Sequence, residues 1–171
     1  MLYVPYYGSL LLHVLAAEDS PFPHPKRGQM LLLATAAQES QFVYTAQIGG
    51  GPARGYLGME GETESSLWND YLAYHEDIAE YITSWCGVSG PSEDALTRGL
   101  VYQMLMARTL YYWRDPAPLP LAYDLQGQWD TYKAHYNTEA GAATWEQFYT
   151  NYQTLVAPYY PAPPSPRRER R

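Results

Sequence analysis

The chain has 171 residues, of which 46% are hydrophobic, and this suits one domain with a substantial core. Its formal net charge is −7, and because the last five residues, RRERR, carry +3, the residues before them carry −10. A body this acidic repels phosphate, so we expect neither nucleic acid nor an anionic membrane surface as a partner.

The cysteine content and the apolar segments exclude two further classes of protein. A single cysteine, Cys86, excludes an intrachain disulfide. No run approaches the ~20 apolar residues that a membrane span needs. The apolar run at Leu10–Ala17 lacks a basic segment before it and is followed by acidic residues, so we expect no signal peptide.

Helical periodicity extends along most of the chain and no alternating strand pattern is convincing, which predicts a mainly α fold. Tyr6–Ala17 is a first expected helix, closed by a proline-rich loop. Gln29–Glu39 is a second, and its apolar stripe is wide enough to be typical of a deeply buried helix. A glycine-rich loop follows, and Thr63 is the expected N-cap of a long helix over 64–87.

The second half of the sequence predicts three more helices and a tail. Leu96–Trp113 is apolar on one side and ends at DPAPLP, because proline removes a donor and blocks helical geometry. A helix near Asp124–Tyr136 comes next, and the capping-box spacing of TWEQ (144–147) opens a last helix to about residue 156. We therefore expect one domain over 1–156 and an extended Pro/Arg-rich tail over 157–171.

Glu39 stands at the end of the apolar helix, where a carboxylate is costly. Low dielectric and the negative end of the helix dipole both disfavour the charged form and should raise its pKa. A carboxylic acid that remains protonated near neutral pH can protonate a glycosidic oxygen. The alternative is a structural glutamate that turns to water or pairs with Arg54.

Two features of composition fit a sugar ligand, although each has a plainer explanation. Eighteen tyrosines offer ring faces that suit sugars, but tyrosines also fill half-exposed helix faces. Gly49, Gly50, Gly51 and Gly55 let a ligand approach the backbone, or they simply serve a tightly turned connection.

Three short motifs resemble those of the soluble lytic transglycosylases and goose-type lysozymes. In that family a Glu-Ser at a helix end precedes a loop that reads G-A-x-G-L-M-Q and then Pro-x-Thr. Here Glu39-Ser40 precedes ARGYLGMEGET (53–63), in which Ala53, Gly55, Leu57 and Thr63 match. HYN (135–137) resembles the third motif, Ala-Tyr-Asn-Ala-Gly. The motifs extend over most of residues 30–155, and the whole is similar to small lysozyme-like proteins of tailed phages.

The resemblance implies a lysozyme-like helical fold and cleavage of the bond between N-acetylmuramic acid and N-acetylglucosamine, with no metal or cofactor. Glu39 would be the general acid and base, giving an anhydro or a hydrolysed product. Tyr136 would approach Glu39, and Asn137 would help to order the site. The implied substrate-binding residues are Ser40, Gly55, Tyr56, Leu57, Met59, Glu60, Tyr136 and Asn137. Glu60 and Glu62 are candidates for a second catalytic carboxylate. We rank Glu60 first as a surface or groove residue and second as a catalytic partner.

The sequence also departs from the family pattern. Gly58 stands where the family has glutamine, Gly61 where it has proline, and Thr-Glu follows Asn137 in place of Ala-Gly. Two hypotheses therefore remain. One is a phage virion-associated enzyme, made in the host cytoplasm and delivered to the cell wall, which acts on peptidoglycan strands. The other is a catalytically silent virion protein that keeps the fold. In either case we expect residues 157–171 to contact neighbouring virion proteins.

Other candidate sites are weak. The four histidines show no metal-ligand spacing with one another or with the cysteine. The tryptophans follow helical patterns that favour core positions, and Trp129 is the exception that could be a sugar platform because it precedes the Tyr136 motif. Binding of nucleic acid rests on the arginine tail alone.

Overall fold

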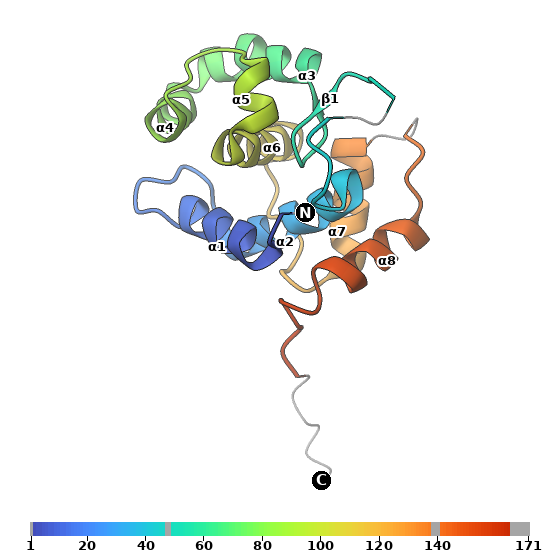
Figure 1. Ribbon diagram of the computed structural model, residues 1–171. Helices are drawn as coiled ribbons and strands as arrows, with labels where there is room; N and C mark the ends of the chain where they lie inside the picture. The colour runs from blue at the N-terminus through green and yellow to red at the C-terminus, as the bar shows by residue number, and fades with distance from the viewer. Residues whose placement is uncertain (1, 47–48, 138–140, 165–171) are drawn as a thin grey trace.

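The computed structural model describes residues 2–46, 49–137 and 141–164 (Figure 1). Helices predominate in these residues, which confirms the predicted mainly α class. The helices are α1 (Val4–Leu15), α2 (Pro25–Ser40), α3 (Gly61–Ser66), α4 (Glu76–Cys86), α5 (Glu93–Arg98), α6 (Leu100–Arg114), α7 (Leu125–Tyr132) and α8 (Trp145–Leu155). Irregular helical turns follow α3 as η1 (Leu67–Tyr71) and η2 (Leu72–Tyr74), and α7 as η3 (Lys133–Asn137).

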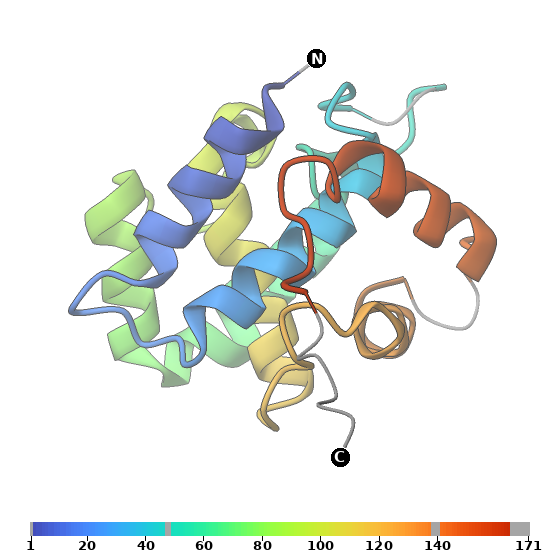
Figure 2. The same ribbon diagram turned by 90° about the horizontal axis from the view of Figure 1, so that it is seen from below.

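Helix α2 is the central element of the packing. It contacts α1, α6, α7 and α8, and ten consecutive residues from Gly28 to Ala37 are buried. Figure 2 shows α2 between α1 and α8. In Figure 1, α3 to α6 form a second group of helices above these three. The buried apolar side chains of both groups form one continuous core cluster. Burial on nearly all sides explains why the apolar stripe of this helix is so wide.

The predicted helix over 64–87 is not continuous. It divides into α3, η1, η2 and α4, and the chain leaves helical geometry at His75, where φ is −131° and ψ is 71°. The cap assignment was also wrong, because Glu60 occupies the N-cap of α3 and Thr63 lies in its first turn. Periodicity did not reveal the break, since both halves turn apolar residues toward the same core.

The predicted helix over 96–113 is likewise two helices. Gly99 separates α5 from α6 in an extended conformation, with φ −82° and ψ 96°. The capping prediction near the end of the chain is confirmed, because the Thr144 and Gln147 side chains form the reciprocal capping box at α8. Asp124, which carried no such prediction, caps α7.

A small hairpin escaped the sequence analysis. Strands β1 (Ala53–Arg54) and β2 (Met59–Glu60) pair antiparallel, with Ala53 opposite Glu60 and Arg54 opposite Met59. Two residues per strand are too few to produce an alternating pattern. The hairpin is nevertheless the element that brings the loop after α2 back to the core.

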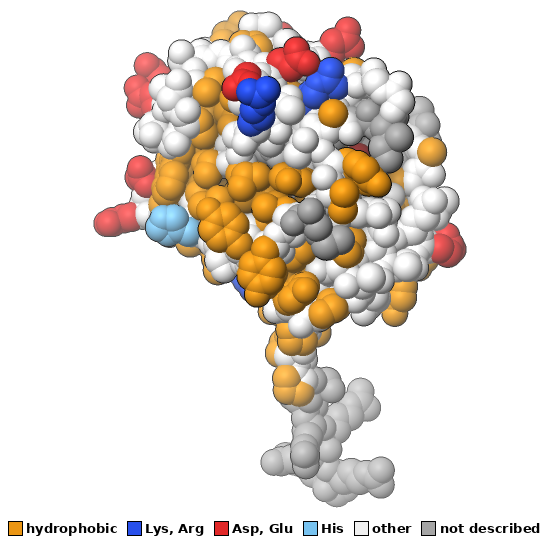
Figure 3. Space-filling model, viewed as in Figure 1, with side chains coloured by type: hydrophobic (Ala, Val, Ile, Leu, Met, Phe, Trp, Pro, Cys, Tyr) orange, Lys and Arg blue, Asp and Glu red, His pale blue; other side chains and the backbone are white. Residues whose placement is uncertain are grey.

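The packed part of the chain continues past the expected boundary at residue 156. Tyr160 packs against α1, where a methyl group added at Gly8 would collide with its ring, and its hydroxyl donates to the Pro5 carbonyl over 3.3 Å. Apolar side chains gather on this face, where exposed Tyr3 meets Tyr159 edge to face (Figure 3). The RRERR segment lies outside the described residues.

We predict that Tyr160→Ala lowers the free energy of unfolding by about 1–2 kcal/mol, because the packing of a partly buried tyrosine ring on α1 is lost. Tyr74→Ala is the matched control, since Tyr74 is 80% exposed. Urea unfolding compares the two variants with wild type. Equal stabilities for both variants would place residue 160 outside the folded domain.

Candidate active site

The turn after α2 fixes where Glu39 lies. Gln41 and Phe42 both have positive φ, at 52° and 56°, which is uncommon for residues other than glycine. Ser40 Oγ supports this turn by donating to the Ala36 carbonyl over 3.0 Å and accepting from the Phe42 amide over 3.2 Å. Phe42 is fully buried and meets Tyr7 edge to face, so core packing offsets the backbone strain.

The Glu39 carboxyl is held on one side by Tyr132. The Tyr132 hydroxyl, on the last turn of α7, donates to Glu39 Oε1 over 2.6 Å. Because Oε1 is occupied as an acceptor, Oε2 is the oxygen that can carry a transferable proton. The contact joins α2 to α7 through two residues that are 93 positions apart in the chain.

Gly58 lies next to the other oxygen of the carboxyl. Its φ is +62°, and a Cβ atom added there would lie 2.8 Å from Glu39 Oε2. Any side chain at this position would displace the carboxyl. The geometry at this position therefore favours glycine.

A stack of tyrosine rings ties the hairpin loop to η3. The ring of Tyr136 stacks on Tyr111, with centroids 5.2 Å apart, and on Tyr132 at 6.2 Å. Its hydroxyl donates to the Leu57 carbonyl over 2.8 Å, and the Tyr111 hydroxyl shares a 2.8 Å hydrogen bond with Thr35. Tyr136 lies in the cleft with Glu39, as the sequence predicted, but the tyrosine that hydrogen-bonds to the carboxyl is Tyr132.

Burial dominates the electrostatics of Glu39. Desolvation raises the pKa of its carboxyl, and the hydrogen bond from Tyr132 opposes this by favouring the carboxylate, with burial the larger effect. Burial also raises the pKa of the hydroxyls of Tyr132 and Tyr136, and the nearby Glu39 charge adds to it. These tyrosines therefore stay protonated and act as donors.

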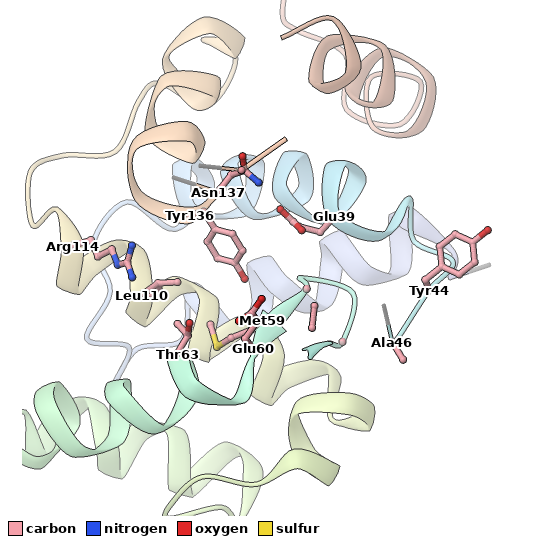
Figure 4. A pocket seen from close by; sticks show the side chains of 14 residues that line it. Glu39, Tyr44, Ala46, Met59, Glu60, Thr63, Leu110, Arg114, Tyr136 and Asn137 are labelled. Carbon is pink, nitrogen blue, oxygen red and sulfur yellow. The ribbon is translucent and has the colours of Figure 1, made fainter. Parts of the chain in front are cut away.

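The carboxyl opens onto a cleft of about 650 Å³ between α2, the hairpin, α6 and η3 (Figure 4). Its charged side chains in the described residues are Glu39, the exposed Glu60 and Arg114. The lining residues are Glu39, Tyr44, Ala46, Ala53, Gly55, Gly58, Met59, Glu60, Thr63, Leu110, Arg114, Tyr136, Asn137 and Gly141.

The structure brings Gly55, Met59, Glu60, Tyr136 and Asn137 together with Glu39 in this cleft. The other predicted binding residues lie outside its lining and support it instead.

Ser40 is buried as the last residue of α2, and Leu57 is 1% exposed and contributes its carbonyl to Tyr136. Tyr56 packs edge to face on Tyr7, and its amide donates to Gln103. Glu62 lines an adjoining hollow rather than the cleft. Trp129 is partly buried, packs against Trp145 and Phe148 at the edge of the core, and does not line the cleft.

Sequence reasoning missed Tyr132, Leu110 and Arg114. Tyr132 carried one usable signal, since it lies four residues before Tyr136 and therefore near it on one helical face. Leu110 and Arg114, both on α6, gave no signal, because their place in the lining of the cleft depends on the tertiary fold.

No group of three or more His, Cys, Asp or Glu side chains within residues 2–46, 49–137 and 141–164 could hold a metal ion. Over the same ranges, no helix has the length and hydropathy needed to cross a membrane. Comparisons with protein-family models, with curated protein sequences and with solved structures give no match.

We predict that Gly58→Ala lowers the free energy of unfolding by at least ~1 kcal/mol, because the residue must keep positive φ and its methyl group meets Glu39. Gly90→Ala is the matched control, since nothing lies within 4 Å of a Cβ added there. Thermal and urea unfolding measure both. A harmless Gly58→Ala would contradict the contact with the carboxyl.

The raised pKa of Glu39 predicts a pH-dependent cost. The folded state keeps a proton that the unfolded chain releases above the ordinary pKa of 4.5, so stability falls as pH rises through the interval up to the raised pKa. Glu39→Gln removes this titration, and we predict that its stability relative to wild type increases as pH rises from about 4.5. Urea unfolding from pH 4 to 8 tests this, with Glu80→Gln on the exposed face of α4 as control. Parallel curves for wild type and Glu39→Gln would contradict it.

Proposed function

We propose that this chain cleaves a β-1,4 glycosidic bond of peptidoglycan, with Glu39 as general acid and then as base. One observation carries the proposal: a partly buried carboxyl with a raised pKa opens onto a cleft, with one oxygen held by Tyr132 and the other next to Gly58, where no side chain fits. A protonated carboxyl in a cleft is the group that glycoside cleavage requires.

In the first step, Glu39 Oε2 gives its proton to the bridging oxygen while the bond from that oxygen to the anomeric carbon breaks. The electron pair of the bond leaves with the protonated oxygen, and positive charge develops on the sugar. Glu39 becomes a carboxylate. The Tyr132 hydrogen bond is stronger to a carboxylate than to the acid, so it stabilises the state formed.

In the second step, the Glu39 carboxylate takes a proton from the attacking hydroxyl. The attacker is either the muramyl 6-hydroxyl, which gives an anhydro product, or water, which gives a hydrolysed one. The intramolecular route needs no second carboxylate, because the substrate supplies the nucleophile and its N-acetyl group can assist. The alternative is assistance by Glu60, the other carboxylate among the described lining residues.

The open cleft favours an enzyme over a silent scaffold. A scaffold descended from the same fold would not need to keep an unfilled cleft at a buried carboxyl, whereas catalysis needs both. Delivery by a phage virion and docking through residues 157–171 are part of the proposal and rest on the sequence resemblance and the composition of the tail.

Digestion of purified peptidoglycan tests the proposal. We predict release of soluble fragments by wild type and at least a ~100-fold slower release by Glu39→Gln, the lower range for losing a general acid. Glu80→Gln, which removes one exposed carboxylate from α4, keeps wild-type activity. Equal rates for wild type and Glu39→Gln, or no release by either, would contradict the proposal.

A further inference from the structure

A lysine at the edge of the cleft holds the side chain of Asn137. Lys133 Nζ donates to Asn137 Oδ1 over 2.8 Å and to the Gly141 carbonyl over 2.7 Å. Lys133 and Asn137 are the two ends of η3, and residues four apart lie on the same side of a helical turn. The ammonium group thus joins the end of η3 to the chain that returns at Gly141.

Gly141 makes this arrangement possible. A Cβ atom at position 141 would lie 2.2 Å from Asn137 Oδ1 and 2.4 Å from its carbonyl oxygen, which no real contact allows. A residue with a side chain would therefore push Asn137 out of position. The close approach leaves the amide group of Asn137 little room on this side.

The chemistry of the two groups decides which way the amide faces. An ammonium group has three donors and no acceptor, whereas an amide has an accepting oxygen and a donating nitrogen. Oδ1 must therefore turn to Lys133, and the nitrogen must turn away. Asn137 lines the cleft, and its amide nitrogen lies on the side that faces Glu39 (Figure 4). This nitrogen donates to no residue in the described part of the chain.

We propose that Lys133 is a positioning residue that keeps the amide N–H groups of Asn137 directed into the cleft, where they donate to the acetamido carbonyl of an N-acetylated sugar. Such a sugar has hydroxyls that both donate and accept, but its amide oxygen accepts only. A site that offers fixed N–H donors therefore selects the acetamido group over a hydroxyl. The choice of ligand rests on the proposed function, whereas the orientation of the amide rests on the hydrogen bonds alone.

Binding of neutral oligosaccharides tests the inference without cleavage. The Glu39→Gln protein is the parent, and its dissociation constants are measured by calorimetry for the tetramer of N-acetylglucosamine and for the tetramer of glucose, which has the same β-1,4 linkage and lacks the acetamido group. We expect the parent to prefer the acetylated tetramer. Lys133→Met should reduce this preference by ~3- to 10-fold, the effect of one hydrogen bond.

Two further variants separate positioning from folding and from charge. Asn137→Asp keeps the contact with Lys133 but loses the N–H donors, so it should reduce the preference for the acetylated tetramer by as much as Lys133→Met does. Lys133→Arg, whose guanidinium is also a donor without an acceptor, should retain much of the preference that Lys133→Met loses. Lys26→Met, which removes one positive charge next to Gln29 and Tyr160, should leave the preference unchanged.

The preference ratio distinguishes positioning from a general loss of structure, because a disturbed fold would weaken both ligands alike. An unchanged ratio in Lys133→Met or in Asn137→Asp would overturn the inference, as would a parent that does not prefer the acetylated tetramer. If Lys133→Met does not fold, Asn137→Asp decides the matter. A protein that binds with this preference but does not cut peptidoglycan would refute the proposed function and leave the inference standing.

Discussion

The site depends on one constraint: at the C-terminal end of α2, the Glu39 carboxyl lies between the Tyr132 hydroxyl and Gly58, a position with no room for a side chain. Burial disfavours its charge, and the tyrosine fixes one oxygen while it leaves the other for a proton. A carboxyl exposed to water would ionise more readily, because water solvates the carboxylate. The arrangement favours the protonated form of a carboxyl that a ligand in the cleft can reach.

Much of the surrounding fold serves to keep the two partners of Glu39 in place. The Tyr136 ring stacks on Tyr111 and Tyr132, and its hydroxyl donates to the Leu57 carbonyl and so holds the hairpin loop that carries Gly58. On the other side of the carboxyl, the strained turn after α2 is paid for by the burial of Phe42. The cleft is therefore formed by contacts among segments that are distant in sequence.

The sequence predicted those features that depend on local chemistry. Burial of α2, the capping box at Thr144 and the raised pKa of Glu39 follow from patterns of adjacent residues. The expectation that Gly55, Met59, Tyr136 and Asn137 lie near Glu39 came from the motif resemblance, and the structure places these residues in one cleft with it. The breaks at His75 and Gly99 were missed, because neighbouring helices with a shared apolar side look like one helix. The sequence also did not predict that Tyr132 is the hydrogen-bond donor to Glu39, because this contact depends on how α7 packs against α2.

The central claim is that burial keeps Glu39 protonated beyond its ordinary range. It is tested most directly by following the side-chain carboxyl carbon of Glu39 with ¹³C NMR from pH 3 to 9, with the resonance assigned by its absence from Glu39→Gln. The account predicts a titration midpoint clearly above 4.5, and a midpoint at or below that value would contradict it.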